Sequence, residues 1–114
     1  MKKRLISSYD EENDTFVGKV DGGHGYYADY GICDGVYLGL DNSNLPTSIY
    51  ISDASHLFNI SKAILESADV KIGISCSSTC LSFCMTVEDL LIFSTKCKNS
   101  FGIPNIKYEM DSNI

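Results

Sequence analysis

The most restrictive feature of the sequence is a strict alternation of apolar residues on both sides of Ser78 and Thr79. A two-residue period is typical of a β-strand with one buried face. Folding the segment about Ser78 and Thr79 brings every apolar position opposite another one. The sequence therefore predicts a hairpin in a single register, with Val70 opposite Val87, Ile72 opposite Met85, Ile74 opposite Phe83 and Cys76 opposite Leu81.

The cysteines are expected to be free thiols that bind no metal. The hairpin register places Cys80 and Cys84 on the face opposite Cys76, so one tetrahedral ion cannot collect all three, and no CxxC pair or nearby histidine completes a zinc site. The total of five is odd, and residues 2–4 are basic but are followed by no apolar stretch of signal-peptide length. These features favour a reducing, cytoplasmic location and no cofactor.

Two more hairpins are predicted nearer the N-terminus. The first joins strands at residues 5–9 and 15–20 through a polar turn, and the second occupies residues 26–40. A two-residue loop, 34–35, and a three-residue loop, 33–35, compete for the second hairpin. The longer loop matches apolar residues better, because it pairs Ile32 with Val36, Tyr30 with Leu38 and Ala28 with Leu40.

Residues 47–65 change from a two-residue period to a helical one. Ile49 and Ile51 share one face of a strand, Asp53 is a suitable N-cap, and Asn59 tolerates the left-handed conformation that ends a helix. The pattern predicts one broken helix across residues 53–67. We therefore expect a single α+β domain over residues 1–114, an antiparallel β-meander of hairpins with this helix packed on the sheet.

Charge and composition limit the classes of function. The chain is 44% hydrophobic and carries a net charge of −6, and it lacks the apolar stretch of about 18 residues that a membrane span needs. Acidity argues against nucleic acid, which binds clustered lysine and arginine. A basic protein is a better partner, although the charge could also serve solubility alone.

Three short motifs, residues 9–14 (YDEEND), 34–36 (DGV) and 52–55 (SDAS), lie in order in the first part of the chain. Together they resemble a small prokaryotic domain family of unknown function that has a tyrosine–aspartate–acidic opening, an internal Asp-Gly turn and a closing Asp-Ala-Ser. The resemblance covers residues 1–66 and leaves 67–114 as a β-rich extension. It implies a compact β-rich fold with a helix and without established catalytic residues, and some family members look like antitoxins.

No arrangement typical of catalysis is visible. His24 lies in a glycine-rich loop and His56 in the predicted helix, neither beside a nucleophile in a recognised frame. A calcium loop starting at Asp10 would need glycine and glutamate where Thr15 and Asp21 stand. We therefore expect the protein not to be an enzyme.

Two binding hypotheses remain. In the first, Asp10, Glu11 and Glu12 bind a small basic, toxin-like protein, with Tyr27 as a surface anchor. In the second, Gly23 and His24 contribute to a site that binds or sequesters a nucleotide or signal compound.

A homodimer is also predicted, from the segment 90–98. Its first four residues are all apolar, so this strand requires cover on both faces. We expect Leu91 and Phe93 to be buried against a second copy. The alternative is a strand that lies wholly inside one monomer.

Overall fold

The computed structural model describes residues 2–23, 28–66 and 69–113. Strands contain 58% of these residues and helices 9%. The elements in chain order are β1 (Lys2–Asp10), β2 (Thr15–Val20), β3 (Ala28–Cys33), β4 (Val36–Leu40), β5 (Pro46–Ile51), α1 (Ala54–Phe58), α2 (Lys62–Glu66), β6 (Val70–Cys76), β7 (Cys80–Val87), β8 (Leu90–Lys98) and β9 (Ile106–Asp111).

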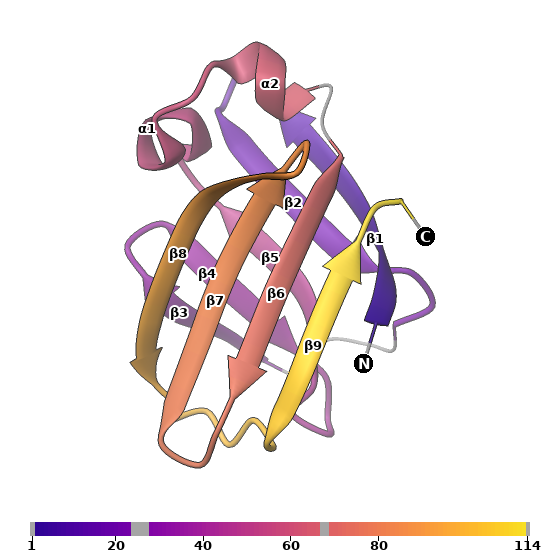
Figure 1. Ribbon diagram of the computed structural model, residues 1–114, viewed down its shortest axis with the longest axis vertical. Coiled ribbons are helices and arrows are strands. Elements are labelled where there is room, and N and C mark those ends of the chain that lie inside the picture. Colours follow the sequence, from indigo (N-terminus) through magenta and orange to yellow (C-terminus); the bar gives the residue numbers. More distant parts are fainter. Residues whose placement is uncertain (1, 24–27, 67–68, 114) are drawn as a thin grey trace.

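The nine strands of the described residues belong to one sheet in the order β3-β4-β5-β2-β1-β9-β6-β7-β8. The sheet curls until its edge strands, β3 and β8, lie near one another, so that it is nearly closed and barrel-like (Figure 1). Strand β1 joins the two halves. Its end at Lys2–Arg4 pairs in parallel with β9, and its remainder, Leu5–Asp10, pairs antiparallel with β2.

The predicted α+β meander is therefore wrong. The fold is mostly β, and the neighbours of β2 are β1 and β5 rather than β3. The pairing of β1 with β9 is parallel, and it links the first strand of the chain to the last. The two helices are five residues each and lie at one end of the curled sheet instead of covering a face (Figure 1). None of the described helices is long and apolar enough to cross a membrane.

The local registers agree well with the sequence pattern. All four predicted pairs of the β6–β7 hairpin are confirmed, as is the hairpin of β1 and β2. In the β3–β4 hairpin Ala28 and Tyr30 have the expected partners, but Cys33 instead of Ile32 lies opposite Val36. The reason is a bulge between Gly31 and Cys33, which absorbs one residue and leaves a shorter turn in which Gly35 has a φ of 81°.

The core fills the space inside the curled sheet. It combines the inward side chains of both halves, among which Phe16, Leu38, Ile51, Ile72 and Phe83 are 0–1% exposed. The alternation of the sequence produces this directly, because β7 reads half-buried and buried in turn along its whole length. The outward positions of the strands are left to make binding surfaces.

The break between the helices is confirmed, but their capping differs from the prediction. Asn59 ends α1 with a φ of 53°, as expected for a left-handed C-cap. Asp53 makes no capping hydrogen bond and is itself left-handed. The backbone N–H groups of Ala54 and Ser55 are bound instead by Asp14, from the distant β1–β2 turn.

Candidate binding surfaces

The turn between β1 and β2 presents an ordered acidic tip, defined as Asp10, Glu11 and Glu12. Asp10 Oδ1 accepts hydrogen bonds from the backbone N–H of Glu12 at 3.0 Å and of Asn13 at 3.3 Å, and Oδ2 accepts one from Asn13 Nδ2 at 2.7 Å. These hydrogen bonds lower the pKa of Asp10, and the one from the Asn13 side chain has the largest effect. All three acidic residues of the tip are exposed.

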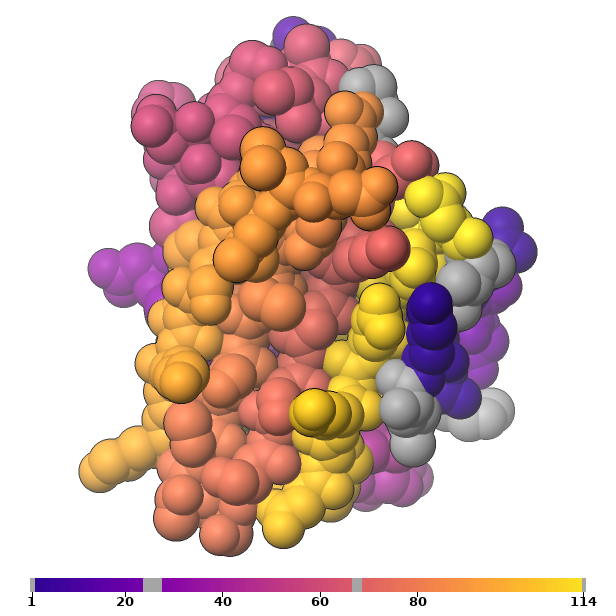
Figure 2. All heavy atoms as spheres, viewed as in Figure 1, coloured from indigo at the N-terminus to yellow at the C-terminus, as the bar shows by residue number. Residues whose placement is uncertain are grey.

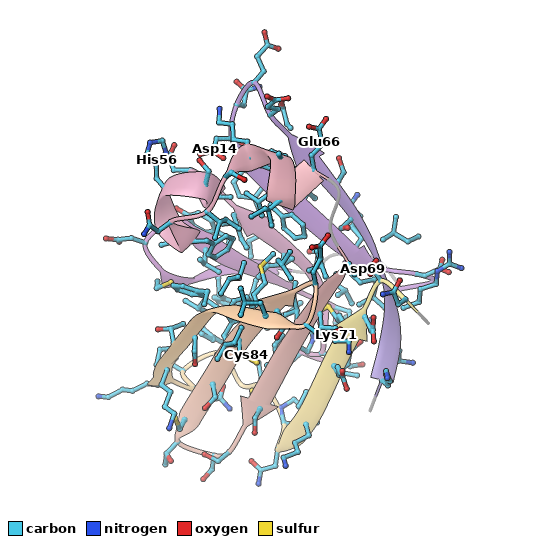
Figure 3. All side chains as sticks on the ribbon, turned by 45° about the horizontal axis from the view of Figure 1, so that its top comes forward. Asp14, His56, Glu66, Asp69, Lys71 and Cys84 are labelled. Carbon is cyan, nitrogen blue, oxygen red and sulfur yellow. The ribbon has the colours of Figure 1, made fainter. Side chains whose placement is uncertain are left out.

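Below the acidic tip, Asp14 ties the hairpin to helix α1. This side chain is buried, and Oδ1 accepts hydrogen bonds from the Tyr9 hydroxyl at 2.6 Å and the Ser55 backbone N–H at 3.0 Å. Oδ2 accepts one from Ser55 Oγ at 2.7 Å and lies 3.3 Å from His56 Nδ1. Figure 3 shows Asp14 and His56 beside α1. The carboxylate thus replaces the expected N-cap.

The electrostatics of this cluster favour the ionised carboxylate. Burial alone would raise the pKa of Asp14, but the hydrogen bonds from Tyr9, Ser55 and His56 outweigh it and hold the pKa well below its usual range. Burial, together with the bond to Asp14, raises the pKa of Tyr9. Both groups therefore keep fixed protonation states near neutral pH.

The combination of Ser55, Asp14 and His56 has the residue types of a hydrolytic triad but the wrong order of contacts. Catalysis needs the histidine between the serine and the carboxylate. Here the carboxylate lies between the other two, so that Ser55 donates to Asp14 directly. The His56 side chain is 84% exposed. The arrangement can anchor a turn and cap a helix, and it offers no base to activate the serine.

A second helix contributes to the acidic tip. Lys62, at the start of α2, donates from Nζ to the Glu11 carbonyl at 2.9 Å. With Tyr9 and the acidic tip it borders an open depression of about 520 Å³. The β1–β2 turn is therefore held by both helices, by α1 at Asp14 and by α2 at Glu11.

The other residues predicted from the sequence are dispersed. Gly23 is exposed, and its predicted companion His24 lies outside the described residues, as does Tyr27. Phe93 is half-buried, with its ring 5.5 Å from that of Phe58 and 6.2 Å from that of Phe83 in the same chain. Leu91 points outward and is 59% exposed. Of the two residues predicted to bury against a second copy, Phe93 is thus already packed within its own chain.

A second surface, which the sequence reasoning missed, is the outer face of β9, β6, β7 and β8. Residues directly opposite one another in neighbouring strands point to the same side. One outward row runs Glu109, Gly73, Cys84, Ser94, and the next runs Lys107, Ser75, Ser82, Lys96. We call this surface the lysine face. Figure 2 views it directly, with β9 in yellow and β6 to β8 in salmon and orange.

The signal for the lysine face was present in the sequence. The alternation that predicted the inner residues of the β6–β7 hairpin also fixes the outer ones, which are small or polar, and only Thr86 among them is β-branched. Asp14 carried no comparable signal, because its partners in helix α1, Ser55 and His56, are more than 40 residues away.

No group of three or more histidine, cysteine, aspartate or glutamate side chains in the described part of the chain could hold a metal ion. All five cysteines are free thiols. Burial raises the pKa of Cys33, Cys76 and Cys97.

No family model matches the chain, and we found no significant match among curated proteins or solved structures. The resemblance to a small prokaryotic family stays a prediction. Function must therefore be argued from the two surfaces themselves.

Proposed function

We propose that this chain is a non-catalytic protein-binding module, antitoxin-like in action, whose acidic tip binds and neutralises a small basic protein. The observation that carries the proposal is the anchoring of the tip. An acidic turn that served only solubility would need no fixed conformation, whereas this one is held from three directions.

The anchors act on different parts of the turn. Asp10 closes it from within, Asp14 binds it to α1, and Lys62 binds the Glu11 carbonyl from α2. A surface ordered before binding loses less conformational entropy when the partner arrives. The exposed carboxylates of Glu11 and Glu12 then supply attraction to a basic surface and speed the encounter.

The experiment compares two variants with the same change of charge. Glu11→Gln with Glu12→Gln removes two charges from the acidic tip, and Glu88→Gln with Asp89→Asn removes two from the β7–β8 turn. Each tagged variant is used to capture proteins from the native host, and captured proteins are identified by mass spectrometry. The purified partner is then titrated calorimetrically.

We expect the captured partner to be basic. Its affinity should fall about tenfold or more in the tip variant, because each interfacial charge pair contributes about 1 kcal/mol. Its affinity for the control variant should change little. The loss should shrink as salt is added. Equal binding by both variants, or capture only of acidic proteins, would refute the proposal.

A homodimer through β8 is a second proposal, supported by the exposure of two adjacent leucines. Leu90 and Leu91 are 67% and 59% exposed on an edge strand, where unpaired backbone groups can add another strand. Light scattering during size-exclusion chromatography tests it. A mass near 12.5 kDa at micromolar concentration would exclude the dimer.

A further inference from the structure

Basic residues are concentrated on the lysine face, although the chain as a whole is acidic. Four of its nine lysines and arginines lie there: Lys71, Lys96, Lys98 and Lys107. The acidic tip lies at the helical end of the molecule, at the turn between β1 and β2. The lysine face can therefore attract anions although the net charge of the chain is negative.

The lysine face is also hollowed. A depression of about 490 Å³ lies over its centre, bordered by Lys71, Ser82, Cys84, Ser94 and Lys107. Its volume falls in the range of about 300–1,000 Å³ that is usual for small-molecule sites. Its floor is formed where Gly73 pairs with Cys84, and a Cβ at Gly73 would lie only 2.8 Å from Cys84 Sγ.

Lys71 and Lys107 border the hollow, and Lys96 lies at the far end of the row that begins at Lys107. The backbone positions of Lys107 and Lys96 are three strand spacings apart, about 14 Å. Lys71 lies four residues along β6 from Ser75, a member of the same row, which is about 13 Å. Their flexible stems allow the ammonium groups to reach a ligand in the middle. Lys71 Nζ also lies 3.5 Å from Oδ1 of the exposed Asp89, and an exposed ion pair of this kind is weak, so a ligand phosphate can replace the carboxylate.

The polar groups between the lysines suit a phosphorylated ligand that also carries hydroxyl groups. Ser82 and Ser94 provide hydroxyl donors for phosphate oxygens. Glu109, at one end of the central row, provides an acceptor for a ligand hydroxyl. No outward aromatic ring lies among the described residues of this face, so it lacks the stacking platform that single-stranded nucleic acid uses.

We propose that the hollow of the lysine face binds a small phosphorylated molecule with free hydroxyls, of the sugar phosphate class. The phosphate lies over the row that contains Gly73 and Cys84, and the lysines that border the hollow neutralise it. This site is separate from the acidic tip and does not depend on the function proposed for it.

Cys84 provides a direct probe, because it is a half-buried free thiol at the floor of the hollow. The native protein is labelled with a maleimide, and labelling rates at each cysteine are followed by peptide mass spectrometry with ribose 5-phosphate, pyrophosphate or ribose present. Cys80, also half-buried on β7 but outside the hollow, reports general effects of the ligand. The buried Cys76 reports unfolding.

At a concentration of ribose 5-phosphate ten times its Kd, labelling of Cys84 should slow about tenfold while that of Cys80 is unchanged. Ribose should have no effect. Protection should be lost in Lys71→Gln with Lys107→Gln, which removes the two lysines that border the hollow, and retained in Lys19→Gln, which removes a lysine from the other half of the sheet. The tip variant Glu11→Gln with Glu12→Gln should be protected like the unmodified chain.

Absence of protection at millimolar ribose 5-phosphate would overturn the proposal. So would equal slowing at Cys80, protection by ribose, or protection that survives loss of both lysines. Ser82→Tyr provides a second test, because it fills the hollow with a residue favoured in strands. Protection of Cys84 by ribose 5-phosphate that persists in this variant would also contradict the site.

Discussion

Replacing Asp14 by asparagine tests whether this carboxylate holds the β1–β2 turn to helix α1. Asparagine keeps the shape of the side chain but removes its charge. It can still accept a hydrogen bond from the Ser55 N–H through its one carbonyl oxygen. The other oxygen becomes an amide donor, and it then faces Ser55 Oγ, which donates to it in the native chain. The change therefore weakens the cap without opening a cavity.

The magnitude follows from three short hydrogen bonds to the carboxylate, at 2.6, 2.7 and 3.0 Å. A bond to a charged group contributes about 1.5–3 kcal/mol and a neutral one about 1, so neutralising the acceptor weakens each by about 1 kcal/mol. Relief of the cost of burying a charge offsets part of this sum. We expect a loss of about 2 kcal/mol in the free energy of unfolding, or about 8 °C in Tm.

The pH dependence identifies the cause. Because the pKa of Asp14 is lower in the folded chain than the unfolded value of about 3.9, its stabilisation is fully present above about pH 5 and is lost as the pH falls toward the folded pKa. Urea denaturation should therefore give a constant difference between the two chains from pH 8 to about 5, and a shrinking one below about pH 4.

Asp10→Asn is the matched control, because Asp10 also accepts three hydrogen bonds in the same turn but is exposed. Asp10→Asn should lower the free energy of unfolding by less than Asp14→Asn does. A difference below about 0.5 kcal/mol for Asp14→Asn at pH 7, or one that does not change between pH 7 and 3, would refute the reasoning.

Three other substitutions, the first with a matched control, have defined outcomes in thermal unfolding. Phe93→Lys should lower the free energy of unfolding by about 3 kcal/mol or more, because the Phe93 ring packs on Phe58. Leu91→Lys, at an exposed position, should change it by less than about 0.5 kcal/mol. Equal effects of the two substitutions would contradict the packing of Phe93. Asn59→Gly should raise stability by up to about 1 kcal/mol, since φ there is 53°, and a loss would be inconsistent with a left-handed cap. Gly18→Ala should cost about 1–3 kcal/mol, because the new Cβ would lie 2.8 Å from a core leucine methyl, and an unchanged Tm would show that the core yields there.

The parts of the fold that could be predicted are those in which neighbouring segments determine each other. The β6–β7 register follows from alternation because a shift by one residue would expose Ile72 and Phe83. The bulge at Ile32 was missed, since the bulged and unbulged hairpins bury the same apolar residues and differ only in backbone geometry.

Contacts between distant segments could not be predicted from periodicity. Asp53 has the residue type of an N-cap, but the cap is supplied by Asp14, which only the assembled sheet brings near. The same limit explains the wrong fold class, because alternation identifies strands without stating which of them are neighbours. The lysine face lies between these cases, since its rows follow from the predicted register but the hollow does not.

The parallel pairing of Lys2–Arg4 with Glu109–Asp111 has a consequence for how the protein is made. During synthesis β1 leaves the ribosome more than 100 residues before β9. At about 5–20 residues per second, the β1 edge of the half-sheet β1 to β5 therefore stays unpaired for several seconds. Pairing of this edge with β9 requires closure of a loop that spans nearly the whole chain, which slows folding. A premature stop before β9 would therefore leave both halves exposed to aggregation, however complete their separate hairpins.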